Sequence, residues 1–304
     1  MRLLLTGSSG FLGRHVLAAA AAADVEVIRA VRANETIEEN VLALGPAPWT
    51  REVFERALQL SQPDVVVHCA GITHAETTQQ FLEANTLPAA AMLDAVAQVA
   101  APPRVILLGS AAEYGFIGAD MMPVREDHPC QPRSAYGISK HSQTLLGLAA
   151  AERGLTVLTV RLFNAVGVGM PSGLALSSFA RRIARALKDG SVLRTGDMTV
   201  ARDFIDVAEA AKILVALADC PGWPWPVVNL CSGHAFRLGT LMETMIAATG
   251  RPLRTEIDPR LLRPGDMPVL TGSVERLAEL GLRPQGPQFD RLIPLLLAEA
   301  QAAV

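Results

Sequence analysis

Thr6-Gly7-Ser8-Ser9-Gly10-Phe11-Leu12-Gly13 is the stretch of sequence that decides the fold. It directly follows an apolar run with the composition of a strand, and it opens an alanine-rich segment with the composition of a helix. In such a strand–turn–helix unit Gly7 permits a tight turn, Gly10 lets the backbone approach a pyrophosphate, and Gly13 allows close helix–strand packing. The N-terminus of the helix offers free N–H groups and the positive end of its dipole. The motif therefore predicts a dinucleotide-binding turn; the alternative is a plain turn.

Around this motif the chain alternates short apolar runs with longer alanine-rich segments. The apolar runs have the composition of strands that are covered on both faces, and they span Arg2–Thr6, Val25–Ala30, Asp64–Cys69, Arg104–Gly109 and Leu155–Arg161. The intervening segments have helical composition and span Phe11–Ala22, Thr50–Leu60, Thr78–Val99 and Tyr136–Arg153. This alternation predicts an α/β fold: a doubly wound parallel sheet of the Rossmann type with right-handed crossovers.

Glycine and proline become frequent after about residue 161, while short strands and helices continue. We expect a smaller, interleaved C-terminal substrate lobe. On this division residues 1–165 form the NAD(P)-binding Rossmann domain, parts of residues 190–235 return to it, and residues 166–304 are mainly substrate-binding lobe.

Composition excludes several classes of protein. The 304 residues contain 27 Lys plus Arg and 30 Asp plus Glu without a basic run, so we expect no nucleic-acid partner. The four cysteines form no Cys-x-x-Cys pair, so we expect no metal site and a reducing, cytoplasmic location. No uninterrupted stretch of about 20 apolar residues occurs, so no membrane span is expected.

A tyrosine and a lysine stand four positions apart in Tyr136-Gly137-Ile138-Ser139-Lys140. On a helix these positions share a face, and a nearby ammonium group would lower the pKa of the phenol from its usual ~10. Such a tyrosine can act as a general acid to a carbonyl or a general base to an alcohol; the alternative is a solvated helix start. Ser110 directly follows the fourth predicted strand, where ligands of open parallel sheets bind, although it could simply cap a turn.

The ordered set of glycine motif, strand-end serine and Tyr-x-x-x-Lys resembles the extended short-chain dehydrogenases that act on nucleotide sugars. The resemblance implies that Ser110, Tyr136 and Lys140 are catalytic and that Lys140 also holds the nicotinamide ribose. It covers essentially the whole chain.

Further segments are similar to the same family. Val66-Val67-His68-Cys69-Ala70-Gly71 resembles its fourth-motif strand, Asn85 matches an asparagine in the next helix, and Arg161-Leu162-Phe163-Asn164 resembles an Arg-x-x-Asn stretch near the nicotinamide amide and the sugar nucleotide. The implied cofactor contacts are Gly7, Gly10, Phe11, Leu12, Gly13, Arg32, Ala70, Asn85, Tyr136, Lys140 and Phe163.

Two arginine motifs indicate the substrate. Arg202-Asp203-Phe204-Ile205-Asp206-Val207 and Arg263-Pro264-Gly265-Asp266 resemble family segments whose arginines hold the diphosphate of a nucleotide sugar. Guanidinium groups pair well with phosphate oxygens, although two ordinary surface arginines are the alternative. The implied substrate contacts are Ser110, Asn164, Arg202 and Arg263.

Two departures from the family pattern narrow the reaction. The 4,6-dehydratases carry an Asp-Glu pair after the strand-end hydroxyl residue, whereas this chain has Ala111 and Ala112, which cannot transfer protons. The Ser-Ala-Ala-x-Tyr-Gly pattern itself resembles epimerases. NAD-preferring members end the second strand with an acid, whereas Val25–Arg32 has none at its end. Arg32 could instead meet the 2′-phosphate of NADP, which favours NADP(H) over NAD(H); an ordinary surface arginine is the alternative.

The leading hypothesis is reduction of the keto group of a nucleotide 4-keto-6-deoxy sugar, and Asp258–Pro264 resembles the GDP-4-keto-6-deoxymannose reductase branch of the family. A nucleotide-sugar 4-epimerase with tightly bound NAD is the close alternative. A ketoreductase with a non-sugar substrate and a cofactor-sensing protein without activity are weaker alternatives. The family likeness also implies a homodimer, built through the predicted helices Thr78–Val99 and Tyr136–Arg153.

Overall fold

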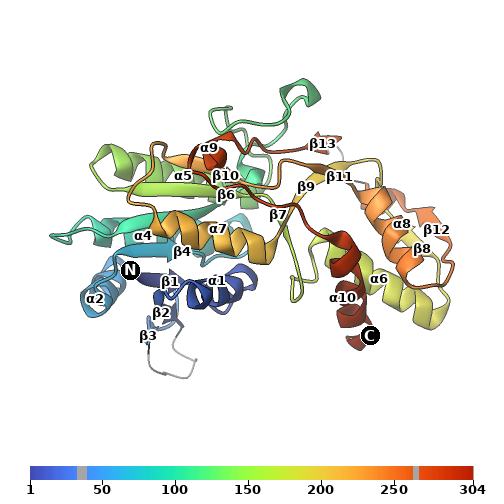
Figure 1. The fold of residues 1–304 in the computed structure, drawn as a ribbon, viewed down its shortest axis with the longest axis horizontal. Coiled ribbons are helices and arrows are strands. Elements are labelled where there is room, and N and C mark those ends of the chain that lie inside the picture. Colours follow the sequence, from blue (N-terminus) through green and yellow to red (C-terminus); the bar gives the residue numbers. More distant parts are fainter. Residues whose placement is uncertain (33–39, 263–266, 304) are drawn as a thin grey trace.

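Seven parallel strands form the main sheet of the computed structural model, which describes residues 1–32, 40–262 and 267–303. Their spatial order is β10-β6-β5-β4-β1-β2-β3 (Figure 1). The strands are β1 (Arg2–Thr6), β2 (Glu26–Val31), β3 (Val41–Ala43), β4 (Val65–His68), β5 (Arg104–Ser110), β6 (Val157–Leu162) and β10 (Val227–Leu230). The chain order reverses direction between β1 and β4, so a topological switch point lies there. The predicted doubly wound fold is confirmed.

Helices cover both faces of this sheet because its strands are apolar on both faces. Leu3 and Leu5 pack toward α1 (Phe11–Ala22) and α7 (Val207–Asp219). Leu4 lies between them in the strand, so its side chain points to the opposite face of the sheet. There it packs toward α2 (Arg51–Ser61), α4 (Leu87–Val96) and α5 (Ala135–Glu152). The three-layer arrangement leaves the carboxyl ends of the strands as the accessible edge for a ligand.

The predicted helix Thr78–Val99 is interrupted. It consists of α3 (Thr78–Phe81), a single π-helical turn η1 (Leu82–Thr86) and α4. The π turn contains Asn85, which is fully buried and hydrogen-bonded outside its own helix. Pro88 lies two positions after the π turn and has no N–H to donate to the preceding helical turn, so the sequence itself favours an irregularity at this point.

The remaining elements form a smaller lobe with its own apolar cluster. Its short strands are β7 (Asn164–Val166), β8 (Leu193–Thr195), β9 (Ala201–Asp206), β11 (Ala235–Arg237), β12 (Thr255–Ile257) and β13 (Val269–Leu270). Its main helices are α6 (Ala175–Asp189), α8 (Leu238–Ala248) and α10 (Phe289–Ala302), which pack together away from the main sheet (Figure 1). Between β9 and β11 the chain passes back to the main sheet to form α7 and β10. The short α9 (Glu275–Glu279) lies beside β10.

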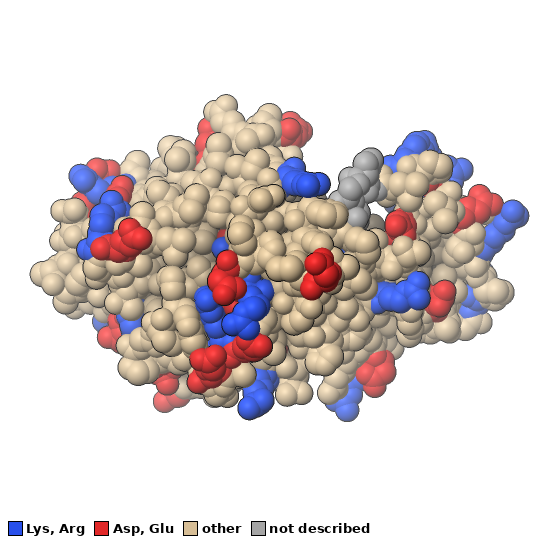
Figure 2. Space-filling model, turned by 90° about the horizontal axis from the view of Figure 1, so that it is seen from above, with Lys and Arg blue, Asp and Glu red and all other residues tan. Residues whose placement is uncertain are grey.

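Charged side chains are distributed without a dominant sign. On the face drawn in Figure 2, basic and acidic groups lie next to each other in small clusters. Within the described ranges, the helices include none that combines the length and apolar character needed to cross a bilayer.

Candidate active site

The glycine turn joins β1 to α1 with almost no spare room. Gly7 has a φ of +71°, and a Cβ there would lie 2.7 Å from the backbone nitrogen of Ala70. A Cβ on Gly13 would lie 2.0 Å from the carbonyl oxygen of Gly7. Gly10 is the N-cap of α1, and within the described chain no side chain caps that end and its first turn holds no acid. The N–H groups at the start of this helix therefore suit an anion such as a pyrophosphate.

Residues from neighbouring strand ends meet at this turn. Thr6 pairs with Ala30 of β2 on one side and with His68 of β4 on the other. The Thr6 hydroxyl accepts a hydrogen bond from the Ala70 backbone at 3.2 Å, which holds the loop after β4 against the glycine turn. Arg32 is exposed directly after β2. The predicted cofactor residues from three strands thus lie along one edge of the sheet, at the switch point.

Asn85 fastens the loop after β4 to helix α5. Its Nδ2 donates to the Ile72 carbonyl at 3.1 Å and to the Ser139 hydroxyl at 2.9 Å, and its Oδ1 accepts from the Ile72 backbone at 2.7 Å. The Ser139 hydroxyl in turn donates to the Tyr136 carbonyl at 2.8 Å. The amide is thereby engaged in holding the segment that carries Tyr136 and Lys140; a contact between Asn85 and the cofactor stays a prediction.

Ser110 and Tyr136 are brought together from β5 and α5. Ser110 is 8% exposed, and its hydroxyl accepts a hydrogen bond from the Ala112 backbone at 3.2 Å as the cap of the short turn η2 (Ala111–Glu113). A Cβ on Gly137 would lie 2.5 Å from the Ala112 carbonyl, so only glycine allows α5 to pack this closely on the turn. A hydrogen bond with the Ser110 side chain lowers the pKa of Tyr136.

The net shift of the Tyr136 pKa is nevertheless upward, because burial outweighs the hydrogen bond and the charge of Glu113 adds to the increase. The expectation that the neighbouring lysine leaves this phenol with a lowered pKa is therefore wrong. Burial is the physical reason, since it disfavours the phenolate.

Lys140 is 4% exposed and points its charge into the protein. Its Nζ donates to Gln143 Oε1 at 2.8 Å, and Gln143 Nε2 donates to the Leu108 carbonyl of β5 at 3.0 Å. Burial lowers the pKa of Lys140 to about 8, against the opposing effects of Glu113 and Cys69. The ammonium form still predominates at pH 7.

The predicted substrate residues lie where the smaller lobe begins. Asn164, the first residue of β7, donates from Nδ2 to the Asp203 carbonyl at 2.7 Å. Arg202 of β9 is half-buried, and its Nη1 donates to the Ala201 and Met267 carbonyls, each at 2.8 Å. Arg263 lies outside the described residues. The ring of Phe163 is 5% exposed and packs in an apolar cluster with Tyr114, so its predicted cofactor contact also stays a prediction.

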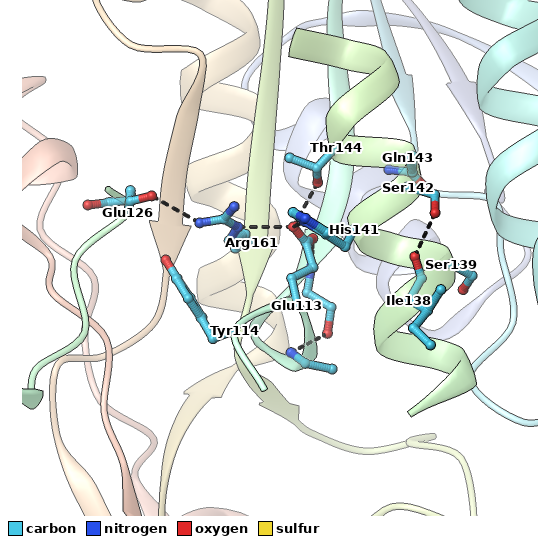
Figure 3. A network of polar contacts seen from close by, with 12 residues as sticks. Glu113, Tyr114, Glu126, Ile138, Ser139, His141, Ser142, Gln143, Thr144 and Arg161 are labelled. Carbon is cyan, nitrogen blue, oxygen red and sulfur yellow. Dashed lines mark hydrogen bonds and ion pairs between the residues drawn. The ribbon is translucent and has the colours of Figure 1, made fainter. Parts of the chain in front are cut away.

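A buried polar network beside the site was missed in the sequence. Glu113 is fully buried and pairs with Arg161, whose Nε donates to Glu113 Oε2 at 3.0 Å (Figure 3). The Arg161 guanidinium also lies over the Tyr114 ring, 4.6 Å from its centroid. The only sequence signal was an acidic residue inside an otherwise apolar strand-end turn, and its partner stands 48 positions further along the chain.

Known proteins resemble the chain over nearly its whole length. Residues 3–229 match the model of the NAD dependent epimerase/dehydratase family. A GDP-6-deoxy-D-mannose reductase of Pseudomonas aeruginosa is 29% identical over 93% of this chain and 92% of its own. A UDP-glucose 4-epimerase of Corynebacterium glutamicum is 28% identical over 96% and 94% of the two chains. Among solved structures, RMD from Pseudomonas aeruginosa complexed with NADPH superimposes with a TM-score of 0.82 at 26% identity, over 100% of this chain and 99% of that one.

Proposed function

The chain belongs to the NAD dependent epimerase/dehydratase family, and we propose that it reduces the keto group of a nucleotide-linked 4-keto-6-deoxy sugar with NADPH. The observation that carries the proposal is that Ser110 ends β5 and Tyr136 and the buried Lys140 begin α5, which packs on the turn after Ser110, in a chain that aligns over 93% of its length with a GDP-6-deoxy-D-mannose reductase.

The bound nicotinamide cofactor supplies the hydride for this reaction. The phenol of Tyr136 donates the proton to the keto oxygen, and the raised pKa of Tyr136 suits a group that must start protonated. The Ser110 hydroxyl shares a hydrogen bond with that phenol and orients the same oxygen. Lys140, held by Gln143, keeps a positive charge within the site, where the developing negative charge on the oxygen is stabilised.

Dehydration is not part of the proposal. Ala111 and Ala112 directly follow Ser110 in the turn η2, and a methyl group can neither remove nor deliver a proton. A reaction confined to one hydride and one proton needs only the groups named above.

The preference for NADPH rests on Arg32. This exposed arginine follows the end of β2, where it can pair with a 2′-phosphate. The similar solved structure, RMD from Pseudomonas aeruginosa, is complexed with NADPH. Arg32→Ala should weaken NADPH binding by about 1.5–3 kcal/mol and leave NADH binding nearly unchanged. Fluorescence titration with both cofactors tests this; equal losses, or a wild-type preference for NADH, would refute the NADPH assignment.

A nucleotide-sugar 4-epimerase is the second candidate. Similarity to a UDP-glucose 4-epimerase over 96% of the chain and the epimerase-like Ser-Ala-Ala-x-Tyr-Gly pattern favour it. An epimerase should retain its cofactor during purification and convert substrate without net oxidation of NADPH. The proposed reductase should consume one NADPH per product.

Substrate class can be tested through the diphosphate. We propose that Arg202 and Arg263 hold the diphosphate, so that binding energy gained there positions the keto group near Tyr136. Arg202→Ala should reduce apparent affinity for a nucleotide sugar by ~2–5 kcal/mol. Arg237→Ala is the matched control, since Arg237 is exposed on the neighbouring strand β11 and its register places it on the other face of that small sheet.

The experiment is a panel of nucleotide sugars and diphosphate-free ketones, assayed by NADPH oxidation and product analysis. The proposal requires turnover of a nucleotide 4-keto sugar, and loss of affinity in Arg202→Ala but not in Arg237→Ala. Equal turnover of a simple ketone with an indifferent Arg202→Ala variant would instead indicate a non-sugar ketoreductase.

A further inference from the structure

Glu113 is a buried carboxylate with no part in the reaction as proposed above. It accepts hydrogen bonds from three other elements of the fold: from the Ser110 backbone at 2.8 Å, from the Thr144 hydroxyl at 2.8 Å and from Arg161 Nε at 3.0 Å. His141 Nδ1 lies 3.9 Å from the same carboxylate. Figure 3 shows the carboxylate between α5, which carries Thr144 and His141, and the strand that carries Arg161. The group therefore ties the end of β5 to both β6 and α5.

The backbone is shaped to admit this carboxylate. A Cβ on Gly109 would lie 2.6 Å from Glu113 Oε1, so any other residue at position 109 would displace the carboxylate. The turn that carries Glu113 also meets α5 directly, where Gly137 leaves room for the Ala112 carbonyl. Gly109 thus leaves room for the Glu113 carboxylate, and Gly137 lets the turn that carries it pack on α5.

Arg161 bears on whether the cluster around Glu113 could bind a metal ion. Glu113, Cys130 and His141 carry donor atoms within 4.8 Å of one another, a grouping that could suit a metal ion. The Arg161 guanidinium already forms an ion pair with Glu113, and it would repel a cation placed among these atoms. The geometry favours an internal ion pair, held in place by the surrounding donors, over a metal centre.

We propose that Glu113 is a positioning residue for the proposed reduction: it locks Ser110 to α5 and places one buried negative charge near Tyr136 and Lys140. The inference rests on the proposed function for the roles of Ser110 and Tyr136. The negative charge of Glu113 raises the pKa of both Tyr136 and Lys140. It therefore helps to keep the phenol and the ammonium group protonated before the reduction. A proton donor that loses its proton too early cannot complete the reaction.

The chain offers a direct spectroscopic test because it contains only two tyrosines. Tyr114 is fully buried, and burial raises its pKa far above the usual value. In a Tyr114→Phe background, tyrosinate absorbance near 295 nm during an alkaline titration reports Tyr136 alone. Adding Glu113→Gln, which preserves the shape and removes the charge, should lower the Tyr136 midpoint measurably. Superimposable titration curves would overturn the proposal.

Glu126→Gln is the matched control for loss of a buried carboxylate. Glu126 is 7% exposed, accepts a hydrogen bond from the Asn229 backbone at 2.8 Å and faces Arg276 at 3.6 Å, and its carbonyl accepts from Arg161. Within the described part of the chain, Glu126 has no hydrogen bond to Ser110 or to α5, so its loss should leave the Tyr136 midpoint in place. If Glu126→Gln shifted the Tyr136 midpoint as much as Glu113→Gln does, the shift would reflect general destabilisation of the fold. That result would overturn the proposal.

Glu113→Asp separates position from charge. Aspartate keeps the charge but is one methylene too short to reach the Ser110 backbone, so the Tyr136 midpoint should stay while kcat falls by about 10- to 100-fold at constant KM. An unchanged kcat would overturn the positioning role. If Glu113→Gln does not fold because Arg161 is left unpaired, the variant Glu113→Gln/Arg161→Met removes both charges and is titrated under the same criteria.

The titration needs neither substrate nor turnover. It can therefore succeed when the nucleotide-sugar panel fails, and it can fail when that panel succeeds. Failure of the proposed substrate class is thus distinguishable from failure of the role of Glu113.

Discussion

At the scale of single residues, burial has opposite consequences for the two groups on the first turns of α5. It disfavours the charged form of each, so it raises the pKa of Tyr136 and lowers that of Lys140 to about 8. Glu113 opposes the change at Lys140 and adds to it at Tyr136. The environment therefore favours a protonated phenol beside an ammonium that is only moderately acidic, which suits the proposed proton transfer to a carbonyl.

Tyr136→Phe should remove the proton donor and retain the ring. Turnover should fall by ~10²–10⁴-fold, because general acid groups contribute about that much, while cofactor affinity stays nearly the same. Steady-state kinetics and a cofactor titration measure the two effects. Turnover within threefold of wild type would remove Tyr136 from the proposed mechanism.

Lys140→Met should stabilise the protein while impairing activity. The folded-state pKa of about 8 lies below the usual 10.5, so the unfolded chain binds more protons between these values. The free energy of unfolding should therefore rise as the pH increases from about 8 to about 10.5, and the cost of the buried charge is fully present below that window. Removing it should raise the free energy of unfolding at pH 7 by on the order of 1–3 kcal/mol.

Urea unfolding at pH 7 and pH 10 checks this expectation. Lys212→Met is the control, because its side chain is 70% exposed and its pair with Glu209 spans 3.7 Å. The control should change stability little at either pH. A Lys140→Met protein that is less stable than wild type at pH 7 would contradict the argument.

At the scale of elements, the start of α1 depends on glycines more than on helix propensity. A Cβ on Gly13 would lie 2.0 Å from the Gly7 carbonyl, so the helix can approach the turn only when position 13 has no side chain. The same approach aims the uncapped N–H groups of α1 at the proposed pyrophosphate position. The contact between Gly13 and the Gly7 carbonyl thus serves both the packing of α1 on the turn and the proposed binding of the pyrophosphate.

Gly13→Ala should therefore cost stability and cofactor affinity together. Forcing a methyl group into a packed contact costs about 1–3 kcal/mol, although alanine alone would favour a helix. Ala18→Gly, at an exposed position of the same helix, should cost about 1 kcal/mol without weakening the cofactor. Thermal unfolding and cofactor titration compare the two variants. Gly13→Ala with wild-type cofactor affinity would show that the contact does not shape the binding turn.

At the scale of the whole molecule, apolar side chains remain exposed on the helices α4 and α5. Leu87 is 54% exposed, Ile138 43% and Leu145 52%. Ile138 and Leu145 are seven positions apart on α5 and so share a face of that helix. We predict that two copies bury these residues against each other in a symmetric dimer.

Leu145→Asp should weaken this dimer by placing a charge in the predicted interface. Light scattering at micromolar concentration should give a dimer for wild type and a monomer for the variant. Leu60→Asp is the control, since Leu60 is 62% exposed on α2, outside the predicted interface, and should leave the dimer intact. A wild-type monomer would refute the prediction.

The sequence by itself determined the glycine turn and the alternation of five strands with helices up to β6, but it did not reveal the short edge strand β3. These features depend on local patterns: apolar runs, helical composition and glycines where the backbone has no room for a side chain. It also predicted Ser110 directly after a strand, at the edge where parallel strands bring their carboxyl ends, and Tyr136 and Lys140 on one face at the start of a helix.

Tertiary structure alone decided the hydrogen-bond partners of Asn85, the burial of Glu113 and the direction of the Tyr136 pKa shift. Asn85 bonds to Ser139 across 54 positions, and Glu113 pairs with Arg161 across 48. No local pattern encodes such partners. The Tyr136 pKa depends on how completely the folded chain removes the phenol from water, and desolvation by distant parts of the chain outweighs the hydrogen bond with Ser110.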